Sequence, residues 1–547
     1  MSLTAEETSH AHDRLDPKSF GEQHNESELL GMRSKIDESC RWPCLVFFAT
    51  GTAWLVVGSL LAMMASIKLH SPEFLAQHAW LTFGRVRPAH LDTVVFGWAS
   101  LTGIGTSLWL MCRLCRTPLR YPSMLVMAAV IWNIGTLAGT IAVLAGESNS
   151  IEYLEFPYYA TFMLFIAFAI VAVWAIFTFG QRQEGHVYVS QWYLFGALFW
   201  FPWLYATVQL LEIAGLVKGV AQESVHWWFG HNVLGLWFTP IGIATIYYLI
   251  PKVIGRPIYS YYLSILGFWS LALFYNWAGA HHLIGGPVPQ WLVTCSIVGS
   301  VMMIIPVTTT AINHHMTARK HLELLRYSPT LRFIVFGAMS YTIVSFQGSA
   351  MSIKAFNEPF HFTHHTIAHA HLGLYAFYSM VMFGAMYYIV PRLTGREWAS
   401  SKLIRLHFWM VSIGITLYFV GLTLGGIIQG FELNQASVPY NEVVGQHGLW
   451  NGTKLFFEGF KEQNGAVKFM AIVHDSIPWL LSRSVAGTMM TIGHLAFGTL
   501  LLINLTGWGR RRVGPTLFRA DDERYHAAMG EEQDWTVPPQ DEQGAHI

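Results

Sequence analysis

The most constraining feature of this 547-residue chain is a series of apolar runs, each long enough to cross a lipid bilayer. A helix needs about 20 apolar residues to cross the hydrocarbon core. Because backbone groups in lipid must be hydrogen-bonded within their own element, these runs predict helices. Twelve spans are expected, at residues 43–67, 89–112, 121–145, 157–179, 188–215, 223–251, 259–284, 290–312, 331–354, 365–391, 403–429 and 483–507.

Composition supports this fold class, an all-α polytopic membrane protein. Only 12% of residues are charged, against roughly 25% in a soluble domain, and 53% are hydrophobic. Membrane lipid is therefore the expected surroundings, and a net charge of zero gives no reason to expect a nucleic-acid partner. The five cysteines suggest no disulfide framework. No histidine follows the Cys112–Cys115 pair, so this pair is not a c-type haem attachment site.

Charge in the connections predicts three regions and an orientation. Residues 1–42 and 511–547 are expected to be polar tails, and residues 43–510 a membrane domain with a long outer connection at 430–482. Because Lys and Arg gather on the cytoplasmic side, both termini are expected in the cytoplasm. The positive charges lie mainly in the even-numbered connections, at Arg113, Arg116, Arg120, Arg182, Lys252, Arg256, Arg319, Lys320, Arg326, Arg332, Arg392, Arg396, Lys402 and Arg405, and in the C-terminal Arg510, Arg511 and Arg512.

Six histidines fall in the outer third of the membrane in this orientation, although they come from four different helices. Ionisable groups inside a membrane are costly and commonly functional. A single histidine at a helix end is more often an interfacial side chain, but convergence of six on one layer favours ligands. They are His90, His231, His281, His282, His369 and His371.

Helical geometry suggests how these imidazoles divide among metals. Each residue turns an α-helix by about 100°, so His369 and His371 point to nearly opposite faces and can serve two cofactors. His281 and His282 point in similar directions and can share one metal with His231. Three imidazoles with an open position suit copper or another borderline metal.

The remaining histidine completes a set of three metal centres. His90 can supply the second axial ligand of one haem iron, which leaves the other iron with a vacant position. Such a pair of metals suits reduction of a small diatomic gas, which side chains alone cannot perform. Tyr275 lies six residues before His281, within reach of the His231 ring. Its spacing fits a redox role and an ordinary core tyrosine equally well.

Over nearly all of residues 43–510 the sequence resembles the catalytic subunit I of haem–copper oxidases, specifically the cbb3-type (C-family) cytochrome c oxidases. The resemblance is carried by "TFGRVRPAH", "WWFGHN", "RPIYSYYLSILGFW", "YNWAGAHHL", "TIAHAHLG" and "GAMYYIVPRLTGREW". It implies the haem–copper oxidase subunit I fold, and low-spin haem b, high-spin haem b3 and a copper ion (CuB) as cofactors.

The resemblance also implies residue roles. Copper would be bound by His231, His281 and His282, with Tyr275 linked covalently to the ring of His231. His369 would bind the high-spin haem iron, and His90 and His371 the low-spin haem iron. Arg87 would pair with haem propionates, for which a guanidinium is well suited. Glu155 matches an acidic residue near a calcium ion, and Tyr247, Tyr261, Ser264 and Tyr341 match positions on a proton path from the cytoplasm.

The function implied is that of a respiratory terminal oxidase in a bacterial inner membrane. Cytochrome c would donate electrons, c-type cytochrome subunits would complete the complex, and dioxygen reduction to water would be coupled to proton translocation. A nitric oxide reductase of the same superfamily is one alternative, although it carries iron in place of copper and uses glutamates where Tyr275 stands. A proton-coupled secondary transporter is another, but it predicts an internal repeat, and none is clear in the sequence.

Two positions depart from the family pattern. Gln347 stands where a glutamate is typical near the high-spin haem, and an amide cannot carry a proton as a carboxylate does. We therefore expect differences in proton delivery rather than in dioxygen reduction. The pair in "FTHHT", His364 and His365, also differs from the usual residues before the haem histidines.

Overall fold

The computed structural model confirms the all-α membrane fold. It describes residues 26–183, 187–212, 214–434, 436, 438–458, 467–509 and 511, and within these it contains twelve helical segments long and apolar enough to cross a membrane. Each one overlaps an expected span.

The spans are built as follows in chain order. The first six are α3 (Glu26–His70); α4 (Phe83–Asp92) with η2 (Thr93–Ser100) and α5 (Leu101–Cys115); α6 (Pro122–Ala145); α7 (Tyr158–Gly180); α8 (Val189–Glu212); and α9 (Val220–Val233) with η3 (Leu234–Phe238) and α10 (Thr239–Ile254). The last six are α11 (Tyr261–Phe274) with η4 (Tyr275–Leu283); α12 (Gln290–Met302) with α13 (Ile304–Ala318) and η5 (Arg319–Arg326); α14 (Pro329–Met351); α16 (His364–His371) with η6 (Leu372–Ser379) and α17 (Met380–Thr394); α18 (Ser401–Asn434); and α21 (Phe469–Leu505). Short helices η1 (Ala79–Leu81), α15 (Lys354–Asn357), α19 (Tyr440–His447) and α20 (Leu449–Phe457) lie between them.

The ends of the chain differ from expectation where the structure describes them. α3 begins at Glu26, so residues 26–42, expected to be part of a tail, continue the first span as one helix. Residues 1–25 and almost all of the expected C-terminal tail, 511–547, lie outside the described residues.

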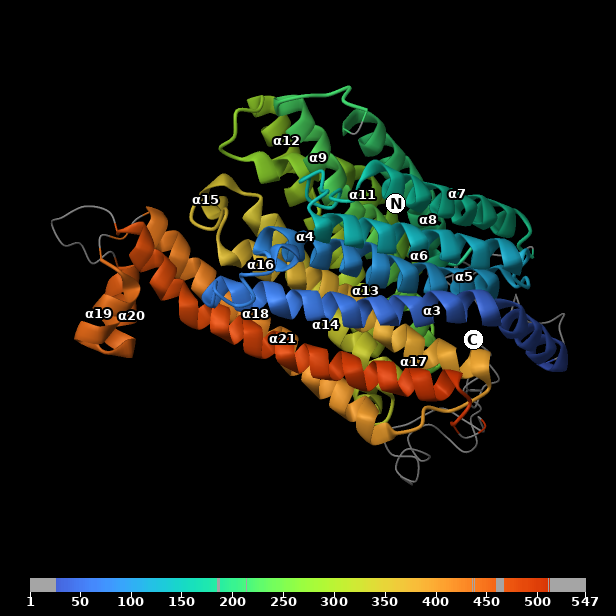
Figure 1. Ribbon diagram of the computed structural model, residues 1–547. Coiled ribbons are helices and arrows are strands. Elements are labelled where there is room, and N and C mark those ends of the chain that lie inside the picture. Colours follow the sequence, from blue (N-terminus) through green and yellow to red (C-terminus); the bar gives the residue numbers. More distant parts are fainter. Residues whose placement is uncertain are drawn as a thin grey trace, which may run out of the picture.

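The long outer connection at 430–482 is largely helical. α18 continues to Asn434, α21 begins as early as Phe469, and α19 and α20 form a hairpin between them. Figure 1 shows this hairpin at one end of the molecule, beyond the ends of most long helices. Asp475 of α21 holds the hairpin by accepting hydrogen bonds from the backbone and side-chain nitrogens of Asn441, at 3.0 and 2.7 Å.

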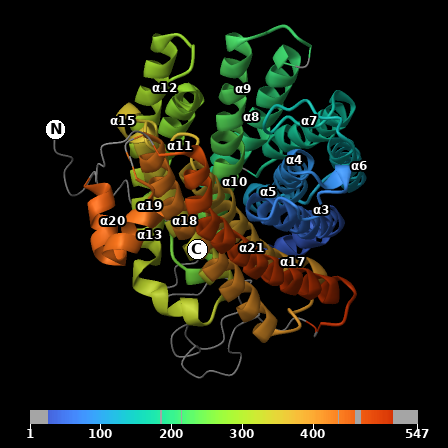
Figure 2. The same cartoon turned by 60° about the vertical axis from the view of Figure 1, so that its left-hand side comes forward.

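Three spans form the centre of the bundle. In the most apolar part of the second, sixth and tenth spans, 94%, 83% and 83% of residues are buried, against 44–56% in the other spans. The long helices α3, α18 and α21 run side by side along one flank (Figure 1), and Figure 2 shows α7 and α8 away from α18 and α21. Residues on the central spans can therefore face protein rather than lipid.

Each central span also contains a π-helical segment directly after a ligand candidate. These segments are η2 after His90, η3 after His231 and η6 after His371. A π-segment widens the helix by an extra residue per turn and is frequent at functional sites. The local geometry thus sets the histidine-bearing half of each span apart from its other half.

Candidate metal and haem centre

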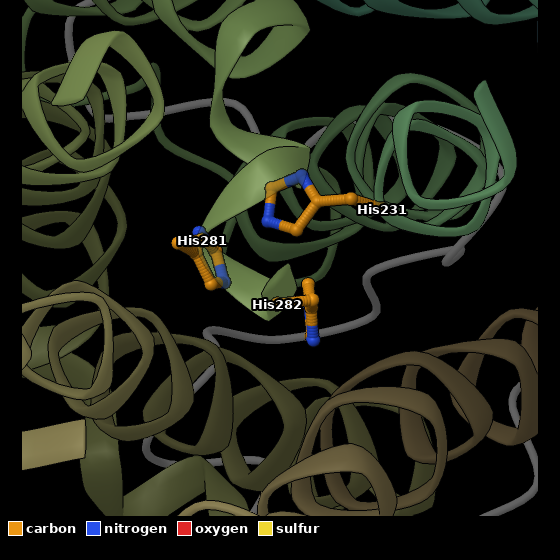
Figure 3. A group of neighbouring side chains, drawn as sticks. All are labelled: His231, His281 and His282. Carbon is orange, nitrogen blue, oxygen red and sulfur yellow. The ribbon is translucent and has the colours of Figure 1, made fainter. Parts of the chain in front are cut away.

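His231, His281 and His282 converge on one point. One ring nitrogen from each lies within 4.8 Å of the others, and no second group of this kind occurs among the described residues. Figure 3 shows the three rings facing a common space, His231 from one helix and the adjacent pair from another. The centroids of the His231 and His281 rings are 5.0 Å apart and their planes are nearly perpendicular.

Neighbouring side chains orient these imidazoles. Ser300 Oγ lies 2.8 Å from His281 Nδ1, and Ser296 Oγ accepts a hydrogen bond from the His281 backbone at 2.7 Å. The His282 ring stacks on Trp227 at 4.0 Å. His231 Nδ1 is buried without a hydrogen-bond partner. Buried polar atoms are normally satisfied, so this nitrogen and the hydrogen-bonded second shell fit a metal ion bound by the three histidines.

Tyr275 lies directly against this group. Its ring stacks on that of His231, with centroids 4.4 Å apart and planes inclined by 28°. Gly235 makes this contact possible, because a Cβ at that position would lie 1.8 Å from the Tyr275 ring. The residues from Tyr275 to Leu283 form the 3-10 segment η4 rather than a continued α-helix, which changes the axial spacing from that expected.

His369 faces the same group from the tenth span. It lies close enough to His231 and His282 for their charges to interact. Its Nδ1 lies 3.2 Å from Gln347 Oε1, and Gln347 Nε2 lies 3.2 Å from His365 Nε2. The Gln347 amide therefore links two imidazoles, and His369 Nε2 remains for a haem iron. The contact between Gln347 and His365 was not expected from the sequence.

His90 and His371 lie together on the other side of the tenth span. They come from α4 and α16 and are near enough to interact electrostatically. His90 Nδ1 and His371 Nδ1 each lie 2.9 Å from a backbone carbonyl, of Gly58 and Ile367. His90 Nε2 is thus available as an iron ligand, whereas Tyr418 Oη lies 3.2 Å from His371 Nε2 and would have to move aside.

Arg87 forms a carboxylate cluster with the loop before α7. It makes an ion pair with Glu152 and lies 3.9 Å from Glu155. Burial raises the pKa of the Glu155 carboxyl to about 7. Asp92, five residues after Arg87 on α4, also has buried carboxylate oxygens without a hydrogen-bond partner. Sequence reasoning missed Asp92, although a carboxylate inside an apolar span is itself a signal.

The four residues expected on a proton path fall into two groups. Tyr247 and Tyr341 belong to one buried cluster with Thr310. Tyr261 donates a hydrogen bond to the Val187 carbonyl at 2.7 Å, and Ser264 donates to the Tyr261 carbonyl at 2.6 Å, so both side chains are engaged locally. Three members of the cluster were not foreseen, namely Thr310, Tyr193 and Asn313, because isolated polar residues in apolar spans give no pattern in sequence.

Fold and site together define a class: a twelve-span helical membrane protein with a three-histidine metal centre and three further histidines suited to haem iron. Comparison with known proteins agrees. Residues 43–460 match the model of the family described as cytochrome c and quinol oxidase polypeptide I. The chain belongs to this family, whose members are the catalytic subunits of haem–copper oxidases, and its cofactors are haem and copper.

Two bacterial oxidase subunits are similar to this chain. The chain is 34% identical to the cbb3-type cytochrome c oxidase subunit CcoN1 of Stutzerimonas stutzeri, over 69% of this chain and 81% of that protein. It is 31% identical to a cytochrome c oxidase subunit 1 homologue of Bradyrhizobium diazoefficiens, over 84% and 80%. A haem–copper terminal oxidase dimer solved by electron cryo-microscopy has the same fold, with a TM-score of 0.63, 16% identity, and coverage of 89% of this chain and 86% of that chain.

Proposed function

We propose that this chain is the subunit of a cbb3-type cytochrome c oxidase at which dioxygen is reduced to water. The observation that carries the proposal is the convergence of His231, His281 and His282 beside His369, in contact with Tyr275. When bound, haem iron and copper supply the one-electron and dioxygen chemistry that amino acids lack. Membership of an oxidase family also counts against the secondary transporter.

In this proposal each residue has its own binding or positioning role. His231, His281 and His282 hold the copper ion (CuB), and Ser300 and Trp227 keep two of these rings in place. His369 binds the high-spin haem b3, while His90 and His371 bind the low-spin haem b. Stacking on His231 supports a covalent link between that ring and Tyr275, whose hydroxyl holds a proton for the reaction.

Protons reach Tyr275 from the cytoplasm along the buried cluster of Tyr247, Thr310 and Tyr341. Tyr341 is close enough to interact with Tyr275, which supports this direction. Ser264 is fully buried on α11 and, with Tyr261, extends the route toward the cytoplasmic end. Hydroxyl groups can donate and accept, so each can pass on a proton.

Arg87 and Glu155 organise the outer side of the site. Arg87 is placed to neutralise haem propionates, and the facing carboxyls of Glu155 and Asp92 supply the oxygen ligands that calcium prefers. We further propose that the complex includes c-type cytochrome subunits that receive electrons from cytochrome c. The complex lies in the bacterial inner membrane among its lipids, with both termini of this chain cytoplasmic.

Metal analysis separates this proposal from nitric oxide reduction. An oxidase of this type contains one copper for every two haems in the chain, whereas the reductase of the same superfamily contains a third iron and no copper. The purified complex should therefore hold copper, and replacement of His281 with Ala should remove it. A third iron in place of copper would assign the reductase.

The high-spin haem gives a second test. We expect His369→Ala to lose the high-spin haem and dioxygen reduction while the optical band of the low-spin haem remains, because His90 and His371 are untouched. His474→Ala, an exposed histidine outside the ligand set, is the matched control. Loss of both haem bands, or of neither, would contradict the assignment of His369.

A further inference from the structure

A buried imidazole outside the metal centre has both ring nitrogens within hydrogen-bond distance of other helices. His494 on α21 is 4% exposed. Its Nδ1 lies 2.7 Å from Ser59 Oγ of α3, and its Nε2 lies 2.5 Å from Tyr375 Oη of η6. No role described above uses this residue.

The hydrogen-bond network determines the tautomer of this ring. Ser59 donates its one hydroxyl hydrogen to the Leu55 carbonyl at 2.7 Å, so toward His494 it accepts from Nδ1–H. Nε2 is then the acceptor, and Tyr375 donates to it. The ring is neutral, with its basic nitrogen pointing at a phenol.

The position of His494 links it to both proposed ligands of the low-spin haem. Ser59 directly follows Gly58, whose carbonyl lies 2.9 Å from His90 Nδ1. Tyr375 lies one helical turn after His371 on the same span. His494 is therefore next to the haem environment on two sides without touching either ligand.

Few ionisable groups face this imidazole. They are Tyr375 of η6 and His407 of α18, whereas α3 presents the hydroxyl of Ser59 and α17 the ring of Phe383, at 6.0 Å. No charged side chain among the described residues is close enough to His494 to interact. An isolated imidazolium in such a site is costly, but negative charge arriving nearby offsets that cost.

His407 is a second buried imidazole near His494. It is fully buried, with Nδ1 2.9 Å from the Tyr387 hydroxyl and with Nε2 lacking a hydrogen-bond partner. Phe383 separates the two imidazoles, with its ring 4.5 Å from that of His407. The backbone carbonyl of Tyr387 accepts a hydrogen bond from Trp398, which lies in the connection between α17 and α18 that is expected to face the cytoplasm.

We propose that His494, hydrogen-bonded to Tyr375, is a proton-accepting site that takes up one proton from the medium when the low-spin haem gains one electron. The proton adds to Nε2, the ring becomes an imidazolium, and the Tyr375 oxygen changes from donor to acceptor. Oxidation reverses each change. The inference rests on the proposed function, because it requires His90 and His371 to hold a haem.

A redox titration of the low-spin haem band in the purified complex tests this site. Electron and proton binding at coupled sites are reciprocal, so the wild-type midpoint potential should fall as the pH rises. His494→Gln and Tyr375→Phe should keep the band and lose this pH dependence. His474→Gln, an exposed histidine on the same helix, should retain it.

His407→Gln is a further control and should leave the equilibrium pH dependence unchanged, because Phe383 separates its ring from that of His494. A wild-type potential that does not vary with pH, or variants that keep the wild-type slope, would overturn the proposal. So would loss of the low-spin band in both His494→Gln and Tyr375→Phe, which would assign these residues a structural role. Absence of any such band in the wild-type complex would instead count against the proposed function itself.

Discussion

At the scale of single residues, Gln347 shows how the structure accommodates a departure from the family pattern. Its amide oxygen faces His369 Nδ1 and its amide nitrogen faces His365 Nε2. A neutral amide accepts from His369 without drawing its proton away, so the imidazole stays neutral. The second departure, His365, gives the amide nitrogen a partner, and the two changes are therefore physically linked.

Replacing this amide with a carboxylate should strengthen the electron donation of His369. Hydrogen bonds with ionised acceptors are roughly twice as strong as neutral ones. In Gln347→Glu we expect a higher iron–histidine stretching frequency in resonance Raman spectra and a lower midpoint potential of the high-spin haem. Gln347→Leu, which removes the bond, should shift the frequency the other way; equal shifts in both variants would contradict the explanation.

In the complex freed of calcium with a chelator, Glu155 should make stability depend on pH. Its folded-state pKa is raised from 4.5 to about 7 by burial, so between these values the folded protein binds more protons than the unfolded chain. Stability should therefore fall as the pH rises from about 4.5 to about 7, by roughly 3 kcal/mol at most. Thermal unfolding of the complex across this range should show the loss, and Glu155→Gln should flatten it. An identical slope in the variant would remove Glu155 as the cause.

At the scale of elements, irregular helix segments build the site. The three π-segments follow His90, His231 and His371, and the 3-10 segment η4 carries Tyr275, His281 and His282. These segments change the direction of side chains relative to an ideal α-helix, and close approach between η3 and η4 is permitted by Gly235. The metal centre thus depends on backbone geometry as well as on ligand identity.

Gly235→Ala should test this dependence on close packing. The new methyl would lie 1.8 Å from the Tyr275 ring, so the ring or the helix must shift. Overpacking of this kind costs roughly 1–3 kcal/mol. We expect lower thermal stability, less copper per haem and at least about tenfold lower activity, since small displacements at a metal centre have effects of this size. Gly180→Ala, where nothing lies within 4 Å, should match the wild type; full copper content in Gly235→Ala would refute the argument.

At the scale of the whole molecule, the buried histidines and the positively charged connections lie toward opposite ends of the spans. The histidine-bearing spans form the buried centre, and the proposed metal centre lies toward the end opposite the arginine-rich connections. The α19–α20 hairpin extends beyond the bundle with Trp450 and Leu449 exposed (Figure 1). The positive charges predict that the opposite end faces the cytoplasm.

Cysteine labelling in cells tests this orientation. The exposed native Cys295 is first replaced by Ser, because the other four cysteines are buried. In that background we expect Trp450→Cys to react with a membrane-impermeant maleimide in spheroplasts. Lys402→Cys, on the arginine-rich side, should react after the membrane is broken. The reverse pattern would invert the topology and place the proton route on the other side.

Much of this architecture was predictable from sequence because its cause is local. Twelve apolar runs must become helices in lipid, and the spacing of His369 and His371 alone implies two cofactors, one on each face of a helix. In the structure, one ring nitrogen each of His231, His281 and His282 lies within 4.8 Å of the others. The identity of the spans and the ligand candidates is therefore encoded in short segments.

Tertiary structure decided the contacts between segments distant in sequence. Asp92 faces Glu155, Gln347 bridges His365 and His369, and His494 joins Ser59 to Tyr375, yet no periodicity or motif relates these positions. The continuation of the first span back to Glu26 and the folding of 430–482 into helices were likewise missed. Apolar periodicity specifies that a helix forms and crosses the membrane, whereas polar contacts between helices depend on which faces meet, and only the packed bundle determines that.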